Sequence, residues 1–119
     1  MESKLEQFVV FVGSQKDVRP FYYASDIFTL TSDRIETFSI AALEAMACGI
    51  PCVLTNIGGA NEMIVPYENG FISEIAFDSI ANYWYMALNT SFSKQKIISR
   101  VADEFNIEKM INNYKKIFS

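Results

Sequence analysis

The stretch formed by residues 36–59, ETFSIAALEAMACGIPCVLTNIGG, constrains the fold of this chain more than any other. Residues 38–47 have the length and the alanine content of a helix, Gly49 ends it, and residues 52–55 follow as an apolar strand. A helix that is apolar on all sides is normally buried, whereas an ionised glutamate is seldom buried without a partner. Glu44, in the middle of this helix, is therefore expected to meet a polar partner or a ligand.

The segments around this stretch predict further strands and helices in alternation. Residues 8–12 (FVVFV) and 27–31 are short apolar runs of the kind found in the strands of parallel sheets, which helices cover on both faces. Asp17 can cap a short helix at residues 18–24 between these two runs. After the strand at 52–55, the pattern predicts one or two helical turns at 60–64 and a short edge strand at 71–73.

The rest of the chain is predicted to be helical. Residues 78–89 form an amphipathic pattern whose aromatic side chains are expected in the core, and helices at 94–105 and 107–118 follow. The alternation predicts an α/β fold, with an open parallel sheet of about four strands, helices on both faces as in a Rossmann-like domain, and a helical C-terminal tail. At 119 residues, the chain is expected to form a single domain.

Composition excludes several classes of function. The net charge of −4 and the scattered basic residues argue against a general nucleic-acid surface. Without histidine, the chain has neither a histidine-based catalytic triad nor a histidine-containing zinc site. Cys48 and Cys52 are too few for a structural metal site and are expected to be buried free thiols in a reducing compartment. The polar start MESKLEQ and the lack of a long apolar run make the cytoplasm the expected location.

The loop after the strand at 27–31 is the expected position of a ligand. In open parallel sheets, ligands bind at the carboxyl ends of the strands, where loops lead into helix N-termini. If the helix begins near Phe38, the backbone amides of Thr37, Phe38 and Ser39 point out of its N-terminus together, and the helix dipole adds partial positive charge. A phosphate group is the natural ligand for such a terminus.

Two carboxylates flank this predicted anion site. Glu36 lies just outside the helix terminus, and Glu44 lies about six residues into the helix, roughly 9 Å along its axis. Carboxylates repel a diphosphate but accept hydrogen bonds from hydroxyl groups, so the arrangement suits a nucleotide sugar. The alternative is that Glu44 pairs with a neighbouring backbone amide or a lysine, and that Glu36 is a solvated loop residue.

These residues carry a resemblance to a known enzyme family. Glu36 and Glu44 are separated by seven residues and are followed by the helix end EAMACGIP, a GG-x-x-E turn that ends at Glu62, and the pair Asn69-Gly70. The combination resembles the donor half of the group 1, family 4 retaining glycosyltransferases, which have the GT-B fold. VVFVG and YASD, at residues 9–13 and 23–26, resemble further segments of the same family, so that nearly the whole chain aligns in order.

The resemblance implies a role for each residue that matches the family motif. Glu36 would be the residue of the catalytic site that contacts the sugar hydroxyls of the donor. The amides of Thr37, Phe38 and Ser39 would hold the diphosphate, and Glu44 would accept hydrogen bonds from the ribose hydroxyls. Such an enzyme transfers a sugar from a nucleotide diphosphate sugar to an acceptor hydroxyl with retention at the anomeric carbon.

Further expectations come from the same resemblance. Gly13, in the loop at 13–15, would lie near the nucleotide base. No metal ion would be required, because fixed dipoles and cations stabilise the leaving group. The biological setting would be the synthesis of polysaccharides, glycolipids or cell-envelope glycans.

The chain also departs from the family pattern. Thr37 and Ser39 stand where family members commonly have glycines, and the upstream arginine and lysine that neutralise the diphosphate have no counterpart before Phe8. The N-terminal acceptor domain is missing as well, so we expect the chain to be part of a larger two-domain enzyme and to be inactive alone. Its expected partners are a nucleotide sugar, the N-terminal domain, a second copy of the chain and, for the full-length protein, the membrane surface, but not nucleic acid.

Two other functions remain open at this point. One is a nucleotide-sugar epimerase of the same fold, which the helix with two glutamates disfavours. The other is a non-catalytic Rossmann-like interaction module, and the presence of both Glu36 and Glu44 argues against it.

Overall fold

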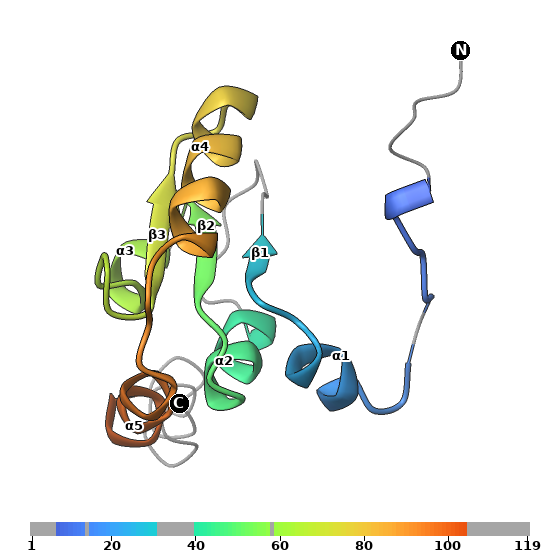
Figure 1. The fold of residues 1–119 in the computed structure, drawn as a ribbon. Coiled ribbons are helices and arrows are strands. Elements are labelled where there is room, and N and C mark those ends of the chain that lie inside the picture. Colours follow the sequence, from blue (N-terminus) through green and yellow to red (C-terminus); the bar gives the residue numbers. More distant parts are fainter. Residues whose placement is uncertain (1–6, 14, 31–39, 58, 105–119) are drawn as a thin grey trace, which may run out of the picture.

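Three parallel strands form the sheet in the computed structural model, which describes residues 7–13, 15–30, 40–57 and 59–104 (Figure 1). The strands β1 (Phe28–Leu30), β2 (Cys52–Thr55) and β3 (Gly70–Ser73) are arranged in the order β1-β2-β3. Cys52 of β2 is paired with Phe28 of β1 on one side and with Gly70 of β3 on the other. The predicted α/β fold with a parallel sheet is confirmed.

Five helices alternate with these strands in the described part of the chain. They are α1 (Arg19–Tyr23), α2 (Ile40–Ala47), α3 (Ala60–Met63), α4 (Phe77–Leu88) and α5 (Lys94–Glu104). The predicted helices at 18–24, 38–47, 60–64, 78–89 and 94–105 therefore have counterparts, whereas the predicted helix at 107–118 lies outside the described residues. Asp17 stabilises the start of α1, since its carboxylate accepts a hydrogen bond from the backbone amide of Arg19 at 3.1 Å.

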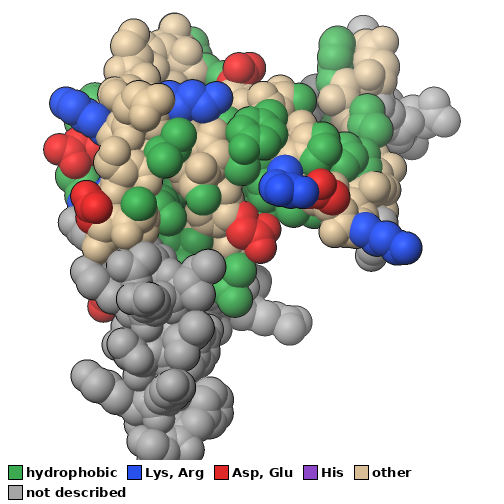
Figure 2. Space-filling view, turned by 90° about the horizontal axis from the view of Figure 1, so that it is seen from below, with side chains coloured by type: hydrophobic (Ala, Val, Ile, Leu, Met, Phe, Trp, Pro, Cys, Tyr) green, Lys and Arg blue, Asp and Glu red, His purple; other side chains and the backbone are tan. Residues whose placement is uncertain are grey.

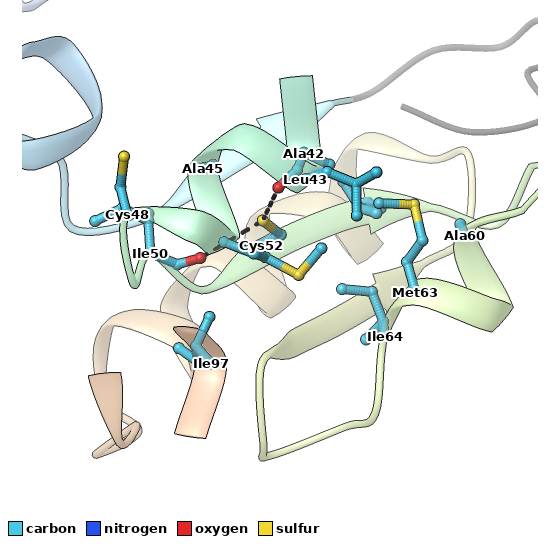
Figure 3. Packing of buried hydrophobic residues seen from close by; sticks show 12 residues of the cluster. Ala42, Leu43, Ala45, Cys48, Ile50, Cys52, Ala60, Met63, Ile64 and Ile97 are labelled. Atoms are coloured by element: carbon cyan, nitrogen blue, oxygen red, sulfur yellow. Dashed lines mark hydrogen bonds between the residues drawn. The ribbon is translucent and has the colours of Figure 1, made fainter. Parts of the chain in front are cut away.

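Helices cover the sheet on both faces because the strand residues alternate in direction. Cys52 and Leu54 point to the face that carries α2, α3 and α5, where they join the main hydrophobic cluster (Figure 3). Val53 and Phe71 point to the other face, where Ala87 of α4 packs on them. All four residues of β2 are buried, as in a strand that helices cover on both faces. The strand predicted at 27–31 was expected to be buried in this way, but β1 is only partly buried and its Thr29 is exposed.

The turn before β3 depends on Asn69, which is buried and fully hydrogen-bonded. Its side-chain amide donates to the backbone oxygen of Met63 at 2.8 Å, and its carbonyl oxygen accepts from the amide of Val65 at 2.8 Å. The next residue, Gly70, has a φ of 152° and lies against the backbone of Cys52. The pair Asn69-Gly70 is therefore a structural device that fixes where β3 begins.

The prediction of a strand at residues 8–12 was wrong. These residues form no strand in the structure, and Figure 1 shows them apart from the sheet, on the far side of α1. Their side chains are exposed, Phe8 by 76% and Phe11 by 93%. An apolar run indicates burial, but a strand also needs a neighbouring strand to pair with its backbone, and the described part of the chain supplies none beside this segment.

The aromatic residues of α4 differ in their environment. Tyr83 packs on Phe71 with ring centroids 5.7 Å apart, as expected of a core residue. Trp84 is 39% exposed, and its indole nitrogen donates a hydrogen bond to Oγ1 of Thr29 at 3.0 Å. Leu88 is exposed as well. The expectation that the aromatic side chains of this helix lie in the core therefore holds for Tyr83 and was wrong for Trp84.

The contrast between Gly70 and Gly49 gives a test of the fold. A Cβ at position 70 would lie 1.8 Å from the backbone oxygen of Cys52, whereas a Cβ at position 49, where φ is 81°, would meet the flexible side chain of Lys94. We expect Gly49→Ala to cost about 1–2 kcal/mol, the usual penalty of a left-handed backbone. Gly70→Ala should cost about 3 kcal/mol or more, because backbone must move. Urea unfolding measures both, and equal losses would contradict this account of the β2–β3 contact.

Candidate functional site

The described part of the candidate site begins at α2. Glu36, Thr37, Phe38 and Ser39 lie outside the described residues, so their roles at the helix N-terminus remain predictions. Glu44 is described, and it lies in the middle of α2.

The helix α2 is buried on one side only. Ala42, Ala45 and Met46 are buried in the main cluster, whereas Ile40 is 52% exposed and Glu44 is exposed. The expectation of a helix buried on all sides was therefore wrong. The alanines let α2 pack closely on the sheet, so a few small side chains are enough to bury one side while the opposite side stays open to solvent.

Glu44 has a hydrogen-bond partner from a different element. The hydroxyl of Tyr22, in α1, donates to Oε2 of Glu44 at 3.2 Å. The sequence predicted a polar partner or a ligand, and the alternative was a backbone amide or a lysine. The partner that the structure shows is a tyrosine 22 residues earlier in the chain.

Tyr22 is held in place by its ring. The ring lies edge-on to that of Phe28, with centroids 6.0 Å apart, and packs against the main cluster. Burial raises the pKa of Tyr22 above its ordinary value, and the hydrogen bond to Glu44 raises it further. No sequence motif indicates this contact, because α1 is short and only its docking on α2 and β1 brings the hydroxyl to Glu44.

The carboxyl ends of β1 and β2 meet at one edge of the sheet. Oγ1 of Thr55, the last residue of β2, lies 3.5 Å from the backbone oxygen of Leu30, the last residue of β1. After β2, the side-chain amide of Asn61, in α3, donates a hydrogen bond to Oδ1 of Asn56 at 2.8 Å. This edge is the one at which parallel sheets bind ligands.

Gly13 is exposed and has a φ of 67°. No described atom outside its chain neighbours lies within 4 Å of the position that a Cβ would occupy there. Close approach of a ligand to this backbone is therefore sterically open, but the structure brings no other described side chain of the candidate site to it. Its predicted contact with the base remains a prediction.

A hollow of about 410 Å³ lies at the opposite end of the sheet. Asp26, Pro51 and Lys94 are among its lining residues, and the first two precede β1 and β2. Because ligands of open parallel sheets bind at the carboxyl ends of the strands, this hollow is not the candidate donor site.

The two cysteines are buried free thiols, as predicted. Burial strongly raises the pKa of the Cys52 thiol, which holds it in the unreactive protonated form. Cys48 and Cys52 thus contribute packing to the cluster in Figure 3.

Neither a metal-binding cluster nor a membrane-spanning helix occurs among the described residues. No group of three or more histidine, cysteine, aspartate or glutamate side chains there could hold a metal ion. None of the helices in the described ranges has the length and apolar character needed to cross a membrane.

The basic side chains are dispersed on the face where the strands begin. Figure 2 shows that face, with lysines and arginines separated by acidic and hydrophobic side chains. Arg19 is paired with Asp17 at 2.9 Å.

Comparison with known proteins decides the family. The family model described as glycosyl transferases group 1 matches residues 2–116, which is nearly the whole chain. The chain belongs to the group 1 glycosyltransferases. The resemblance that the two glutamates and the EAMACGIP segment carry is thereby confirmed.

Curated relatives of this glycosyltransferase chain are enzymes with different sugars and acceptors. It is 31% identical to the N-acetyl-alpha-D-glucosaminyl L-malate synthase of Bacillus anthracis, over 96% of the chain and 31% of the relative. It is 26% identical to an Escherichia coli galactosyltransferase named for diphosphoundecaprenol-linked GlcNAc, over 98% of the chain and 31% of that enzyme. The chain thus spans about a third of the length of these relatives.

Solved structures confirm the fold. Sucrose-phosphate synthase from Thermosynechococcus elongatus matches with a TM-score of 0.80 and 28% identity, over 96% of this chain and 31% of the other. HepE from Anabaena, solved in complex with UDP, matches with a TM-score of 0.75 and 25% identity, over 96% of this chain and 33% of HepE. The parallel sheet flanked by helices is that of group 1 glycosyltransferases with the GT-B fold.

The contact between Tyr22 and Glu44 predicts how Tyr22 titrates. Glu44→Gln should lower the pKa of Tyr22 toward the ordinary value of 10.0 without reaching it, because burial is the larger cause of the shift and remains. The pKa of Tyr22 is higher in the folded protein than in the unfolded chain. The contribution of Tyr22 to the stability of the fold is therefore fully present below pH 10 and is lost as the pH rises through the pKa of the folded state. NMR titration of the tyrosine rings, with Tyr22→Phe to assign the signal, measures this shift. Glu68→Gln, an exposed carboxylate elsewhere, is the control, and an unchanged Tyr22 titration in Glu44→Gln would contradict the contact.

Proposed function

We propose that this chain is the donor-binding part of a retaining glycosyltransferase, which transfers a sugar from a nucleotide diphosphate sugar to an acceptor hydroxyl. The match to HepE carries the proposal, since it covers 96% of the chain and the HepE structure contains UDP. A second HepE structure, solved with UDP-glucose, also matches with a TM-score of 0.57 and 28% identity, over 85% of this chain and 33% of HepE. We therefore take a uridine diphosphate sugar as the first donor to test.

The proposed chemistry is divided between two carboxylates and a helix N-terminus. Glu36 binds the sugar hydroxyls, the amides of Thr37, Phe38 and Ser39 bind the diphosphate, and Glu44 binds the ribose. The exposure of the Glu44 carboxylate supports this division, because a ligand can reach it from solvent. Fixed dipoles aimed at the diphosphate stabilise the charge that develops on the leaving group as the glycosidic bond breaks.

The acceptor class follows from the relatives and is broader than the donor class. The names of the relatives include a diphosphoundecaprenol-linked sugar and the lipopolysaccharide core. We propose an acceptor of this general kind, a glycolipid or growing cell-envelope glycan, for the full-length protein. Such an acceptor would bring the enzyme to the cytoplasmic membrane surface.

The sheet itself supports a larger domain around this chain. In the doubly wound order 3-2-1-4-5-6, the strand before the change of direction lies at one edge of the sheet, and two strands separate it from the next strand in sequence. If residues 8–12 take the third place and β1 the fourth, the first and second strands would lie between them, and Figure 1 shows residues 8–12 apart from β1. We propose that upstream polypeptide of the same protein supplies these two strands and pairs with the edge of β1 at which the described part of the chain places no strand.

Removal of the Glu44 carboxylate should weaken donor binding. Glu44→Ala in the full-length protein is expected to reduce the affinity for UDP about tenfold or more, because the ribose hydroxyls lose a charged acceptor. Calorimetric titration with UDP and UDP-glucose measures the change.

Glu68→Ala is the matched control for Glu44→Ala. Glu68 is also an exposed carboxylate, but it lies in the turn before β3, at the opposite end of the sheet. If the full-length protein binds neither UDP- nor GDP-sugars, and Glu44→Ala changes nothing, the proposal is wrong.

The proposed upstream strands predict a small effect of one substitution in the 119-residue chain and a large effect in the full-length protein. Phe11→Asp should change the unfolding free energy of the 119-residue chain by less than about 0.5 kcal/mol, because Phe11 is exposed there. In the full-length protein, the same change should cost about 3 kcal/mol or more, because it places a charge in a buried strand. Denaturant unfolding of both proteins measures the difference.

Phe77→Asp is the control, since Phe77 is 91% exposed and lies beyond β3, away from the free edge of β1. We expect small changes of the unfolding free energy in both proteins.

We also expect the 119-residue chain alone to dimerise through its uncovered apolar surface and to lack transferase activity. A small effect of Phe11→Asp in the full-length protein, or a monomeric and active 119-residue chain, would contradict the larger domain.

A further inference from the structure

The hydroxyl of Tyr22 meets a carboxylate that solvent would otherwise leave free to move. Glu44 lies on the exposed side of α2, and a solvated glutamate side chain samples several rotamers. The hydrogen bond of 3.2 Å joins its Oε2 to a donor from another element. A hydrogen bond to an ionised acceptor is stronger than one between neutral groups, so it selects one position of the carboxylate.

Tyr22 is itself well placed to act as a fixed donor. Its ring packs edge-on against Phe28 of β1 and against the main cluster, so its hydroxyl position depends on β1 as well as on α1. The next residue, Tyr23, differs in both exposure and ring contact: its side chain is 63% exposed, and the centre of its ring lies 5.9 Å from Nζ of Lys94. The chain thus provides a tyrosine held against the sheet and an exposed one side by side.

We propose that Tyr22 is a positioning residue for donor binding, which holds the Glu44 carboxylate in the orientation that accepts the ribose hydroxyls. The inference rests on the proposed function and assigns a role to a residue outside the two-glutamate motif. A carboxylate has two oxygens with about four lone-pair sites, and Tyr22 uses one of them. Oε1 and the remaining site on Oε2 stay available for the two hydroxyls of a ribose.

Tyr22 increases the affinity for UDP because it orders the Glu44 side chain before the ligand binds. A glutamate that must be immobilised on binding loses rotamer entropy at that moment, and a pre-oriented one does not. We expect Tyr22→Phe to weaken the binding of UDP about three- to tenfold. The phenylalanine keeps the ring and its packing on Phe28 and removes only the hydroxyl.

The experiment compares UDP with 2′,3′-dideoxy-UDP, which lacks the ribose hydroxyls. Calorimetric titrations of the full-length protein are made with the wild type, Tyr22→Phe and Tyr23→Phe. We expect Tyr22→Phe to lose affinity for UDP but not for the dideoxy analogue, and Tyr23→Phe to bind both ligands as the wild type does. A double-mutant cycle that combines Tyr22→Phe with Glu44→Gln should show that the effects of the two substitutions on UDP binding are not additive.

Each other outcome overturns the inference in a recognisable way. An equal loss for both ligands would show that Tyr22 only supports the packing of α1. A gain in UDP affinity would show that Tyr22 competes with the ribose for Glu44. If the wild type binds UDP and the dideoxy analogue equally well, Glu44 does not bind ribose and the positioning role is lost, although donor binding stands. A wild type that binds no UDP, GDP or corresponding sugar would overturn the proposed function itself.

Discussion

The pairing of β2 with a strand on each side is the interaction on which the rest of the structure depends. All four residues of β2 are buried, and its backbone hydrogen bonds are divided between β1 and β3. Helices can then pack on both faces, α2 through small alanine side chains and α4 through Tyr83 and Ala87. The approach of Gly70 to the backbone of Cys52 permits this pairing, because any side chain at Gly70 would hold the two strands apart.

Local patterns were enough to predict most of this fold. The strand at 52–55 and the helix boundary at Gly49 follow from apolar runs and from a glycine with positive φ, both of which act over a few residues. Residues 8–12 have an equally clear apolar pattern, yet they form no strand. Strand formation there depends on a neighbour in the sheet, and a property of the neighbour cannot be derived from the run itself. The exposure of Trp84 has the same origin, since Trp84 contacts Thr29 of β1, which is an edge strand of the described sheet.

The candidate site was predicted less completely, for a related reason. The two-glutamate motif identified Glu44, and its need for a polar partner followed from the cost of leaving a charge without one. The position of Glu44 on the solvent-facing side of α2 lowers that cost, because water solvates the carboxylate and no neutralising cation is needed. Tyr22 could not be predicted, because the contact joins residues that only the docking of α1 brings together. Motifs within one segment are visible in a sequence, whereas pairs between segments require the packing.

The positions of the positively charged side chains bear on how the proposed donor site could bind a diphosphate. The described cations are Lys16 and Arg19 near α1, and Lys94, Lys96 and Arg100 on α5. Arg19 is paired with Asp17, and Lys94 lines the hollow at the amino ends of the strands, opposite the edge where a diphosphate would bind. Dipoles at one helix N-terminus supply about half an elementary charge, which is less than a diphosphate requires beside two carboxylates. The described part of the chain therefore provides a carboxylate that can accept hydrogen bonds from hydroxyl groups, but little positive charge at that edge. Under the proposed function, the balancing cations come from the upstream polypeptide that also completes the sheet beside β1, so donor binding and completion of the fold are expected to depend on the same segment.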